Sequence, residues 1–393
     1  MSVFKSPPYV PCLMGPGKLL IPVAAAAVIL VMAGTFLVQN DECKTIEAEI
    51  VGAGTFDSYL IDVPRDAFYA GGIELGDRLV LSFPDKTCYA YFICDHSGIA
   101  SLDMYVNCYS GDQDVEIGIY DYQIGLLLDY GAGTKVSIAK EGGKADYFDK
   151  IPHYSAGYSD EREDFGSAQE YGNYREVTQG DFKKGRLYRS ASPMQHNGTR
   201  YLYCDAFLRE VDADYVFSIS IGMEDVEGYR YPGSYAFSLY DEGRMVARSL
   251  NPAVLCHEDE ILFVMDTVLD LEGSIGISCS QGKDRTGIYC AMLESLAGAS
   301  YQEVRDDYLL SMCNYYGIEK GSIEYDTVGS MVIDRLFYIF QNPEVLDDVT
   351  DVDWSIMDIG GYDAEGIVTE YLLGIGMDAG RLEMLKSSLR DSQ

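Results

Sequence analysis

Residues 276–287 constrain the fold of this chain more than any other stretch. They read Gly-Ile-Ser-Cys-Ser-Gln-Gly-Lys-Asp-Arg-Thr-Gly, which predicts a short strand, a tight loop and the first turn of a helix. A strand that leads directly into a helix is typical of α/β folds with a mostly parallel sheet. The loop N–H groups and the positive end of a helix beginning at Thr286 converge on one point. We therefore expect an anion-binding site at the carboxyl end of this strand, in a central sheet with helices on both faces.

The side chains of this loop add reactive groups to the anion site. Cys279 and Arg285 enclose five residues, and Arg285 can donate to two oxygens of one phosphate. Cys279 lies in the positive field, which favours its thiolate, and a thiolate held against phosphorus is a nucleophile for phosphoryl transfer. A buried structural cysteine beside a surface arginine is the alternative that a bare C-x5-R pattern leaves open. The residues predicted to surround the phosphate together with Arg285 are Ser280, Gln281, Gly282 and Lys283.

Residues 279–287 resemble the signature of the atypical bacterial tyrosine and lipid phosphatases, whose loop reads C-x-x-G-K-D-R-T-G. That group is part of the cysteine-dependent protein tyrosine phosphatase superfamily. The resemblance implies an α/β phosphatase domain, a cysteinyl-phosphate intermediate on Cys279, and catalysis without a metal or other cofactor. It implies that Arg285 holds the phosphate and that Asp284 protonates the leaving group, while the Thr286 hydroxyl can hydrogen-bond the sulfur. The sequence departs from the family at Ser278, where the family usually has His.

Two segments ahead of the loop extend the resemblance. Residues 173–177 and 187–193 are similar to the family segments N-F-R-x-h and L-Y-R-S-x-x-P, so the predicted phosphatase domain covers residues 165–393. The resemblance places Arg189 near the loop, where it orients the loop or contacts the substrate. Asp225, with Glu224, follows a strand predicted at 216–221, and either is a rival for the acid role. Another alternative is that Asp284 pairs with Arg189 and only braces the loop.

The region before the phosphatase domain reads as a separate, small all-β domain over residues 44–150. Short strands are predicted at 46–50, 59–63, 78–83, 88–94, 102–106 and 115–120, separated by Gly, Asp and Pro turns. This spacing favours a β-sandwich or barrel, for which we expect a binding, spacing or shielding role. One disulfide among Cys88, Cys94 and Cys108 is plausible outside the cytoplasm.

Residues 1–40 are predicted to be a signal anchor or a cleaved signal peptide. About twenty apolar residues run from Leu19 to Val38, long enough to cross a bilayer, with Lys5 and Lys18 ahead of them. The lysines predict that the N-terminus stays inside. The remainder of the chain is then extracytoplasmic, either membrane-anchored in the cell envelope or secreted.

Composition limits the partners of this chain. It has 29 Lys and Arg residues and 63 Asp and Glu residues, which give a formal net charge of −34. This charge argues against nucleic acid and against anionic lipid surfaces as binding partners. The function that these features favour is a phosphatase acting on phosphomonoesters of a phosphorylated protein, on phosphotyrosine alone or with dual specificity. The alternatives are a phosphoinositide or inositol phosphate phosphatase, suggested by the extra charge of Lys283, and a phosphate-binding pseudophosphatase, suggested by Ser278. The sequence predicts no metal site and no oligomeric state.

Overall fold

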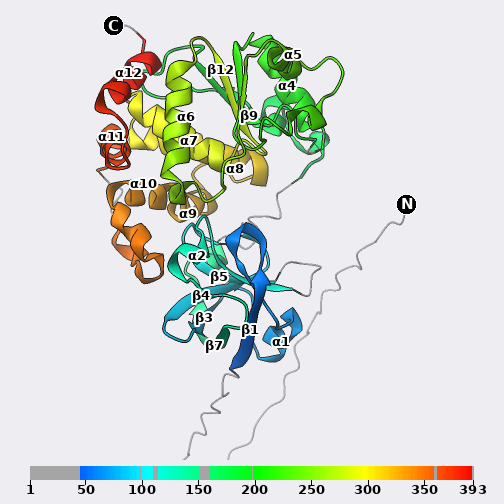
Figure 1. The fold of residues 1–393 in the computed structure, drawn as a ribbon, viewed down its shortest axis with the longest axis vertical. Coiled ribbons are helices and arrows are strands. Elements are labelled where there is room, and N and C mark those ends of the chain that lie inside the picture. Colours follow the sequence, from blue (N-terminus) through cyan, green and yellow to red (C-terminus); the bar gives the residue numbers. More distant parts are fainter. Residues whose placement is uncertain are drawn as a thin grey trace, which may run out of the picture. The chain divides into compact units, whose positions relative to one another are not determined.

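The computed structural model describes residues 45–96, 99–108, 114–150, 159–196, 198–357 and 361–391 (Figure 1). The segment Cys43–Gln393 forms one compact unit. Among the described residues, none of the helices is both long and apolar enough to span a bilayer. The predicted anchor or signal peptide at 1–40 lies outside the described residues, so it and the extracytoplasmic location stay predictions.

The N-terminal region is a closed β-barrel of seven strands in the order β1-β2-β6-β5-β4-β3-β7. All neighbouring strands pair antiparallel except β4 and β5, which run parallel. Alternate side chains point into the barrel, as in β3, where Leu79 and Leu81 are buried. The predicted β-rich architecture is therefore confirmed, in a barrel that belongs to the same compact unit as the rest of Cys43–Gln393. The strands are β1 (Ile46–Ala53), β2 (Tyr59–Ile61), β3 (Asp77–Ser82), β4 (Thr87–Ile93), β5 (Met104–Asn107), β6 (Val115–Ile119) and β7 (Lys135–Lys144).

Strand β7 is the part of the barrel that the sequence analysis missed. It pairs with both β1 and β3, so it is the strand that closes the barrel. Its sequence carries four lysines or glutamates and the pair Gly142 and Gly143, which weaken a strand signal. Two short helices, α1 (Arg65–Ala70) and α2 (Ile124–Leu127), complete this region.

The predicted disulfide is wrong, because Cys88, Cys94 and Cys108 are all free thiols. Cys88 and Cys94 are six residues apart along β4 and its end, a span of about 20 Å that a disulfide cannot bridge. The Cys108 thiol instead donates to the carbonyl oxygen of Ile93 at 3.3 Å.

A five-stranded sheet forms the second half of the unit, in the order β11-β10-β12-β9-β8. Its strands run parallel except for β8, which pairs antiparallel with β9, so the predicted mostly parallel sheet is present. The central strand β12 is buried along its whole length. The strands are β8 (Arg175–Glu176), β9 (Leu187–Ala191), β10 (Tyr215–Ser218), β11 (Met245–Ala247) and β12 (Ile275–Cys279).

Helices cover both faces of this sheet (Figure 1). On one face, Val216 of β10 packs into an apolar cluster with α4 (Arg200–Glu210) and α5 (Tyr235–Asp241). On the other face, Phe217 packs with α6 (Glu258–Asp270) and α7 (Asp284–Leu296). A Cβ on Gly276 would lie 2.4 Å from the Leu208 side chain, so glycine in β12 permits the close approach of α4.

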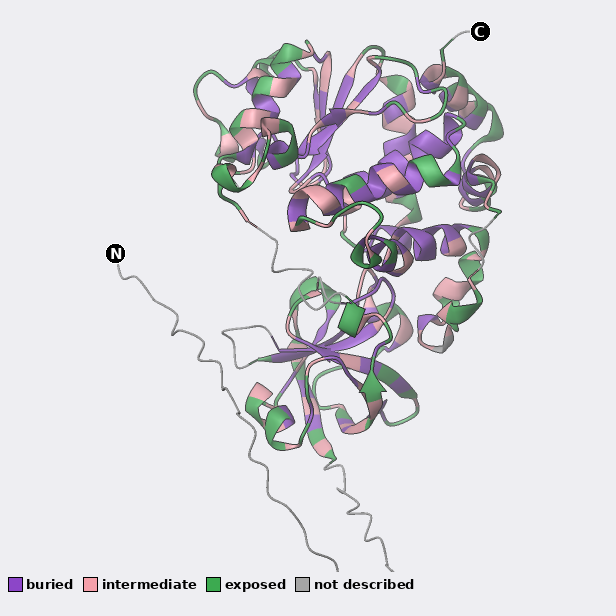
Figure 2. Cartoon of the chain, turned by 180° about the vertical axis from the view of Figure 1, so that it is seen from behind, coloured by how far each residue is buried: buried purple, intermediate pink, exposed green. Residues whose placement is uncertain are grey.

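The helix that follows the loop is enclosed by protein. Every residue of α7 from Thr286 to Leu296 is buried, and Figure 2 shows buried residues concentrated in the sheet and the helices around it. A helix that is buried on all sides is held in one position by its neighbours, which fixes the start of α7. Five later helices follow: α8 (Tyr301–Tyr316), α9 (Ile323–Met331), α10 (Ile333–Gln341), α11 (Ala364–Gly374) and α12 (Ala379–Leu389).

Polar contacts join the barrel to α9 and α10 within this unit. The Arg335 Nη1 atom lies 2.6 Å from the Asp103 carboxylate and donates to the Ser101 carbonyl oxygen at 2.6 Å. The Ser101 amide donates in turn to the carbonyl oxygen of Met331 at 2.9 Å. We call these four residues the seam. Outside the seam, Lys86 pairs with Asp348 at 2.8 Å.

Candidate active site

The predicted phosphate-binding loop begins where β12 ends, at Cys279, and it finishes where α7 begins, at Asp284. The predicted strand, loop and helix are therefore present, with the helix starting two residues earlier than expected. Gly282 has φ +64°, and a Cβ there would lie 2.2 Å from the Ser190 carbonyl oxygen of β9. Only glycine accepts this conformation at such a close approach. Cys279 itself is buried at the base of the loop.

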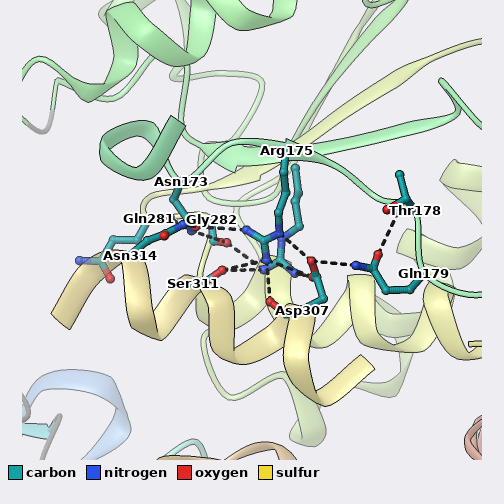
Figure 3. A network of polar contacts seen from close by, with 10 residues as sticks. Asn173, Arg175, Thr178, Gln179, Gln281, Gly282, Asp307, Ser311 and Asn314 are labelled. Carbon is teal, nitrogen blue, oxygen red and sulfur yellow. Dashed lines mark hydrogen bonds and ion pairs between the residues drawn. The ribbon is translucent and has the colours of Figure 1, made fainter. Parts of the chain in front are cut away.

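The carbonyl oxygens of the loop are hydrogen-bonded by groups outside the loop (Figure 3). Asn173 Nδ2 donates to the carbonyl oxygens of both Gln281 and Gly282 at 3.1 Å. Tyr315 OH donates to Gln281 at 2.9 Å, and Arg189 Nη2 donates to Gly282 at 3.0 Å. A loop whose carbonyl oxygens are held on the outer side is free to direct its N–H groups to the inner side, which is the arrangement of an anion nest.

A buried charge cluster supports this loop from behind. Asp307 of α8 accepts from Arg175 Nε and from Arg189 Nη1, both at 2.6 Å. Burial alone raises the pKa of Asp307, but the charges of Arg175 and Arg189 outweigh burial and hold that pKa well below its usual range. We call Asn173, Arg175, Arg189 and Asp307 the brace. The prediction that Arg189 lies near the loop is thus matched by a direct contact.

Glu294 of α7 adjoins the brace and is also buried. Burial, and secondarily the negative charge of Asp307, raise the pKa of Glu294 well above its usual range. These shifts favour the neutral form of Glu294 and the ionised form of Asp307. Arg175 and Arg189 thus share the single carboxylate of Asp307 behind the loop.

The remaining loop side chains have several partners. Arg285 Nη1 donates to the carbonyl oxygens of Leu250 at 2.9 Å and Ile219 at 3.4 Å. Lys283 Nζ donates to Tyr316 OH at 2.7 Å and lies 3.4 Å from the Asp284 carboxylate. The Ser280 carbonyl oxygen accepts from the Ser192 amide at 3.4 Å.

Two buried hydroxyl groups next to the loop have no hydrogen-bond partner among the described residues. They belong to Ser278, at the position before the cysteine, and to Thr286, in the first turn of α7. A buried hydroxyl without a partner is uncommon, so the Thr286 hydroxyl is available to a sulfur or a ligand. No group of three or more His, Cys, Asp and Glu side chains that could hold a metal occurs in the described part of the chain.

A cavity of about 320 Å³ opens beside the loop. Asp284 and Arg285 form one wall, and the 251–253 segment adds to it. The opposite wall comes from the barrel, to which the sequence analysis assigned no chemistry. The barrel residues that line the cavity are Phe56, Asp57, His96, Tyr105, Ile119, Tyr120, Asp121 and Tyr122.

Residues 240–390 match the family model described as "Tyrosine phosphatase family". This part of the chain is therefore similar to the tyrosine phosphatase family. The matched range contains the whole catalytic loop with α7 and α8, which confirms the resemblance inferred from residues 279–287.

Solved structures also show similarity to this chain. An uncharacterized conserved protein from Thermotoga maritima has 16% identity over 26% of this chain and 38% of that chain, with a TM-score of 0.23. This chain thus spans well under half of that protein. TpbA from P. aeruginosa has 19% identity over 37% of this chain and 87% of that chain, also with a TM-score of 0.23. No curated protein matches the chain.

Two further carboxylates are rivals for the acid role. Glu224 and Asp225 follow β10, and both are exposed. Neither is among the described residues that line the cavity. One alternative is that Asp284 pairs with Arg189 and only braces the loop. That pairing is wrong, because Arg189 pairs with Asp307 at 2.6 Å and Asp284 pairs with Lys283.

Sequence reasoning missed Asp307 and Glu294 in the phosphatase domain. A signal for Asp307 is present in α8, because the buried residues Val304 and Ser311 lie three residues before it and four after it, on the same helix face. An acid on a buried helix face requires a buried cation, and such a cation lies far away in sequence. Arg175 and Arg189 precede the family-matched range, yet they support its loop.

Proposed function

We propose that this protein is a cysteine-dependent phosphatase that hydrolyses phosphomonoesters through a cysteinyl-phosphate intermediate. The observation that carries the proposal is the position of Cys279, buried at the base of a loop whose carbonyl oxygens are bound by the brace. The family match over residues 240–390 supports the same class of reaction.

In the proposed first step the Cys279 thiolate attacks phosphorus and the ester oxygen leaves. The loop N–H groups hold the phosphoryl oxygens, and Arg285 turns from the carbonyl oxygens of Leu250 and Ile219 to join them. The leaving oxygen takes a proton from a carboxyl group, for which the resemblance implies Asp284. Water then attacks phosphorus, and the Thr286 hydroxyl hydrogen-bonds the departing thiolate.

The partners of Lys283 bear on the choice of substrate. Its ammonium group donates to Tyr316 and lies 3.4 Å from the Asp284 carboxylate, so much of its charge is already balanced. This arrangement favours a substrate with one phosphate, such as a phosphorylated side chain, over an inositol polyphosphate. We further propose that residues 1–40 target the enzyme to the cell envelope or for secretion.

Replacement of the nucleophile tests the proposed function. The wild-type protein should hydrolyse nitrophenyl phosphate in the presence of a chelator, and Cys279→Ser should reduce turnover at least about 10⁴-fold while still binding tungstate. Cys313→Ser, on α8 and outside the cavity lining, is the matched control and should keep full activity. Substantial turnover by Cys279→Ser overturns the mechanism. Tungstate binding without turnover by the wild-type protein indicates a pseudophosphatase.

A further inference from the structure

We propose that Asp121, a residue of the β-barrel, donates the proton to the leaving oxygen in the phosphatase reaction. This inference rests on the proposed function and reassigns one step of it. The barrel would then be part of the catalytic machinery of the phosphatase domain rather than an appended module.

The first support is position. Asp121 lines the same cavity as Asp284 and Arg285. Arg285, the proposed phosphate ligand, therefore borders a space that Asp121 also borders. Asp225 and Glu224, the exposed carboxylates after β10, do not line this space.

The second support is the rigid mounting of Asp121. It lies in the turn after β6, where Ile119 and Tyr122 form an isolated bridge, and its φ of +59° fixes an uncommon backbone conformation. Ser101 Oγ donates to Asp121 Oδ2 at 2.7 Å, while the backbone of Ser101 belongs to the seam. Tyr122 OH donates to the Leu346 carbonyl oxygen at 2.8 Å. The turn is thus attached to the second half of the unit on both sides.

The third support is the protonation state. Burial among the surrounding side chains, and secondarily the negative charge of Asp284, raise the pKa of Asp121 to about 7, although the carboxyl stays partly open to the cavity. The Ser101 hydrogen bond and Lys283 act in the opposite direction. A proton donor works best when its pKa lies near the working pH. The titratable or charged groups around it are Asp57, His96, Tyr105, Tyr120, Tyr122, Cys256, Lys283, Asp284, Arg285 and Tyr308.

The proposed steps balance. In the first, the Cys279 sulfur–phosphorus bond forms as the phosphorus–oxygen bond breaks, and the Asp121 carboxyl proton moves to the leaving oxygen. In the second, water attacks phosphorus, the sulfur–phosphorus bond breaks, and the Asp121 carboxylate accepts the proton of that water. Asp284 is then a positioning residue whose charge helps to keep the proton on Asp121.

The decisive experiment compares leaving groups. Asp121→Asn keeps an oxygen that accepts from Ser101, and Asn tolerates a positive φ, so the variant should fold. A phenol with a pKa of about 10, as in phosphotyrosine, needs the proton far more than nitrophenol does. Asp121→Asn should therefore lower kcat/KM on phosphotyrosine about 100-fold and on nitrophenyl phosphate less than about 5-fold. The matched control is Asp212→Asn, at φ +50° with a hydroxyl donor of its own in Tyr235, which should change neither value.

The pH profile gives a second readout that a structural role would not move. Wild-type kcat/KM should fall as pH rises above about 7, because Asp121 loses its proton, and Asp121→Asn should remove this decline. Ser101→Ala removes a hydrogen bond that favours the charged carboxylate, so it should shift the decline to higher pH. Equal losses on both substrates, or a specific loss with Asp284→Asn instead, overturn the assignment to Asp121. If turnover does not depend on Cys279, the proposed function fails instead.

Discussion

The two walls of the cavity are built in different ways. The loop wall is formed by Asp284 and Arg285, and the loop that leads to them rests on the buried charges of the brace. The barrel wall carries Asp121, more than 150 residues earlier in the chain, and is attached through the seam. Both attachments use a buried arginine–aspartate pair, Arg189 with Asp307 and Arg335 with Asp103.

The two walls differ in the group that each arginine–aspartate pair holds in place. The brace places two arginines and one carboxylate behind the loop that is proposed to bind the phosphate. The seam supports the turn that carries Asp121, in a wall that also contains Tyr105 and Tyr120. Phosphate binding and leaving-group protonation would then be separable, and each wall can be disturbed without direct change to the other.

Loss of the brace carboxylate should have the largest effect on stability. Asp307→Asn leaves Arg175 and Arg189 without a buried counter-charge, which should cost about 3–5 kcal/mol of unfolding free energy and abolish turnover. The neighbouring Asp306→Asn breaks an ion pair with the exposed Lys320 and should cost about 1 kcal/mol or less. Urea unfolding followed by circular dichroism measures both. Similar costs for the two variants would contradict a special role for the brace.

The pH dependence sharpens this prediction. The folded-state pKa of Asp307 is lowered, so its stabilising contribution is present above its unfolded value of about 4 and is lost as pH falls below it. The stability difference between the wild type and Asp307→Asn should therefore shrink in acid. A difference that stays constant down to pH 2 would contradict this account.

Loss of the seam arginine should have a smaller effect. Arg335→Met removes the charge beside Asp103, but Tyr147 OH still donates to Asp103 at 2.7 Å, so the expected cost is about 2–3 kcal/mol. Because the seam mounts Asp121, phosphotyrosine turnover should fall more than nitrophenyl phosphate turnover. Arg381→Met breaks two exposed pairs on α12 and is the control, with an expected cost under about 1 kcal/mol. Thermal unfolding measures the stability cost of both variants. An equal loss of turnover on both substrates in Arg335→Met would show that the seam does not act through Asp121.

The last effect concerns Asp121 and pH. Its folded-state pKa is raised to about 7 from an ordinary value of 3.8, so the folded protein binds more protons than the unfolded chain between those pH values. Wild-type stability should therefore decrease as pH rises from about 4 to 7, and Asp121→Asn should lack that decrease. The variant should gain stability relative to the wild type over this range. A relative gain in the opposite direction would show that Asp121 is ionised in the folded state.

Local patterns predicted most of the elements. The alternation of β3 and β4, the helical face of α6, and the strand, loop and helix around Cys279 all appear where the sequence indicates them. One strand was missed and one disulfide prediction fails, both for reasons beyond local pattern. The missed strand, β7, has a weak strand composition and is held by pairing with β1 and β3. Cys94 and Cys108 remain thiols although β4 and β5 pair, since the Cys108 thiol bonds to a backbone oxygen.

The sequence by itself determined the catalytic loop, because the glycine, the cysteine, the arginine and the helix start act over eight residues and need only local backbone geometry. Only the tertiary structure decided what surrounds that loop. Asp307 finds its arginines more than 110 residues away, and Asp121 reaches the cavity through the seam. The ion-pair partner of a charged residue cannot be predicted from the sequence alone. Long-range pairing depends on how the whole chain packs and on which water-free sites that packing creates.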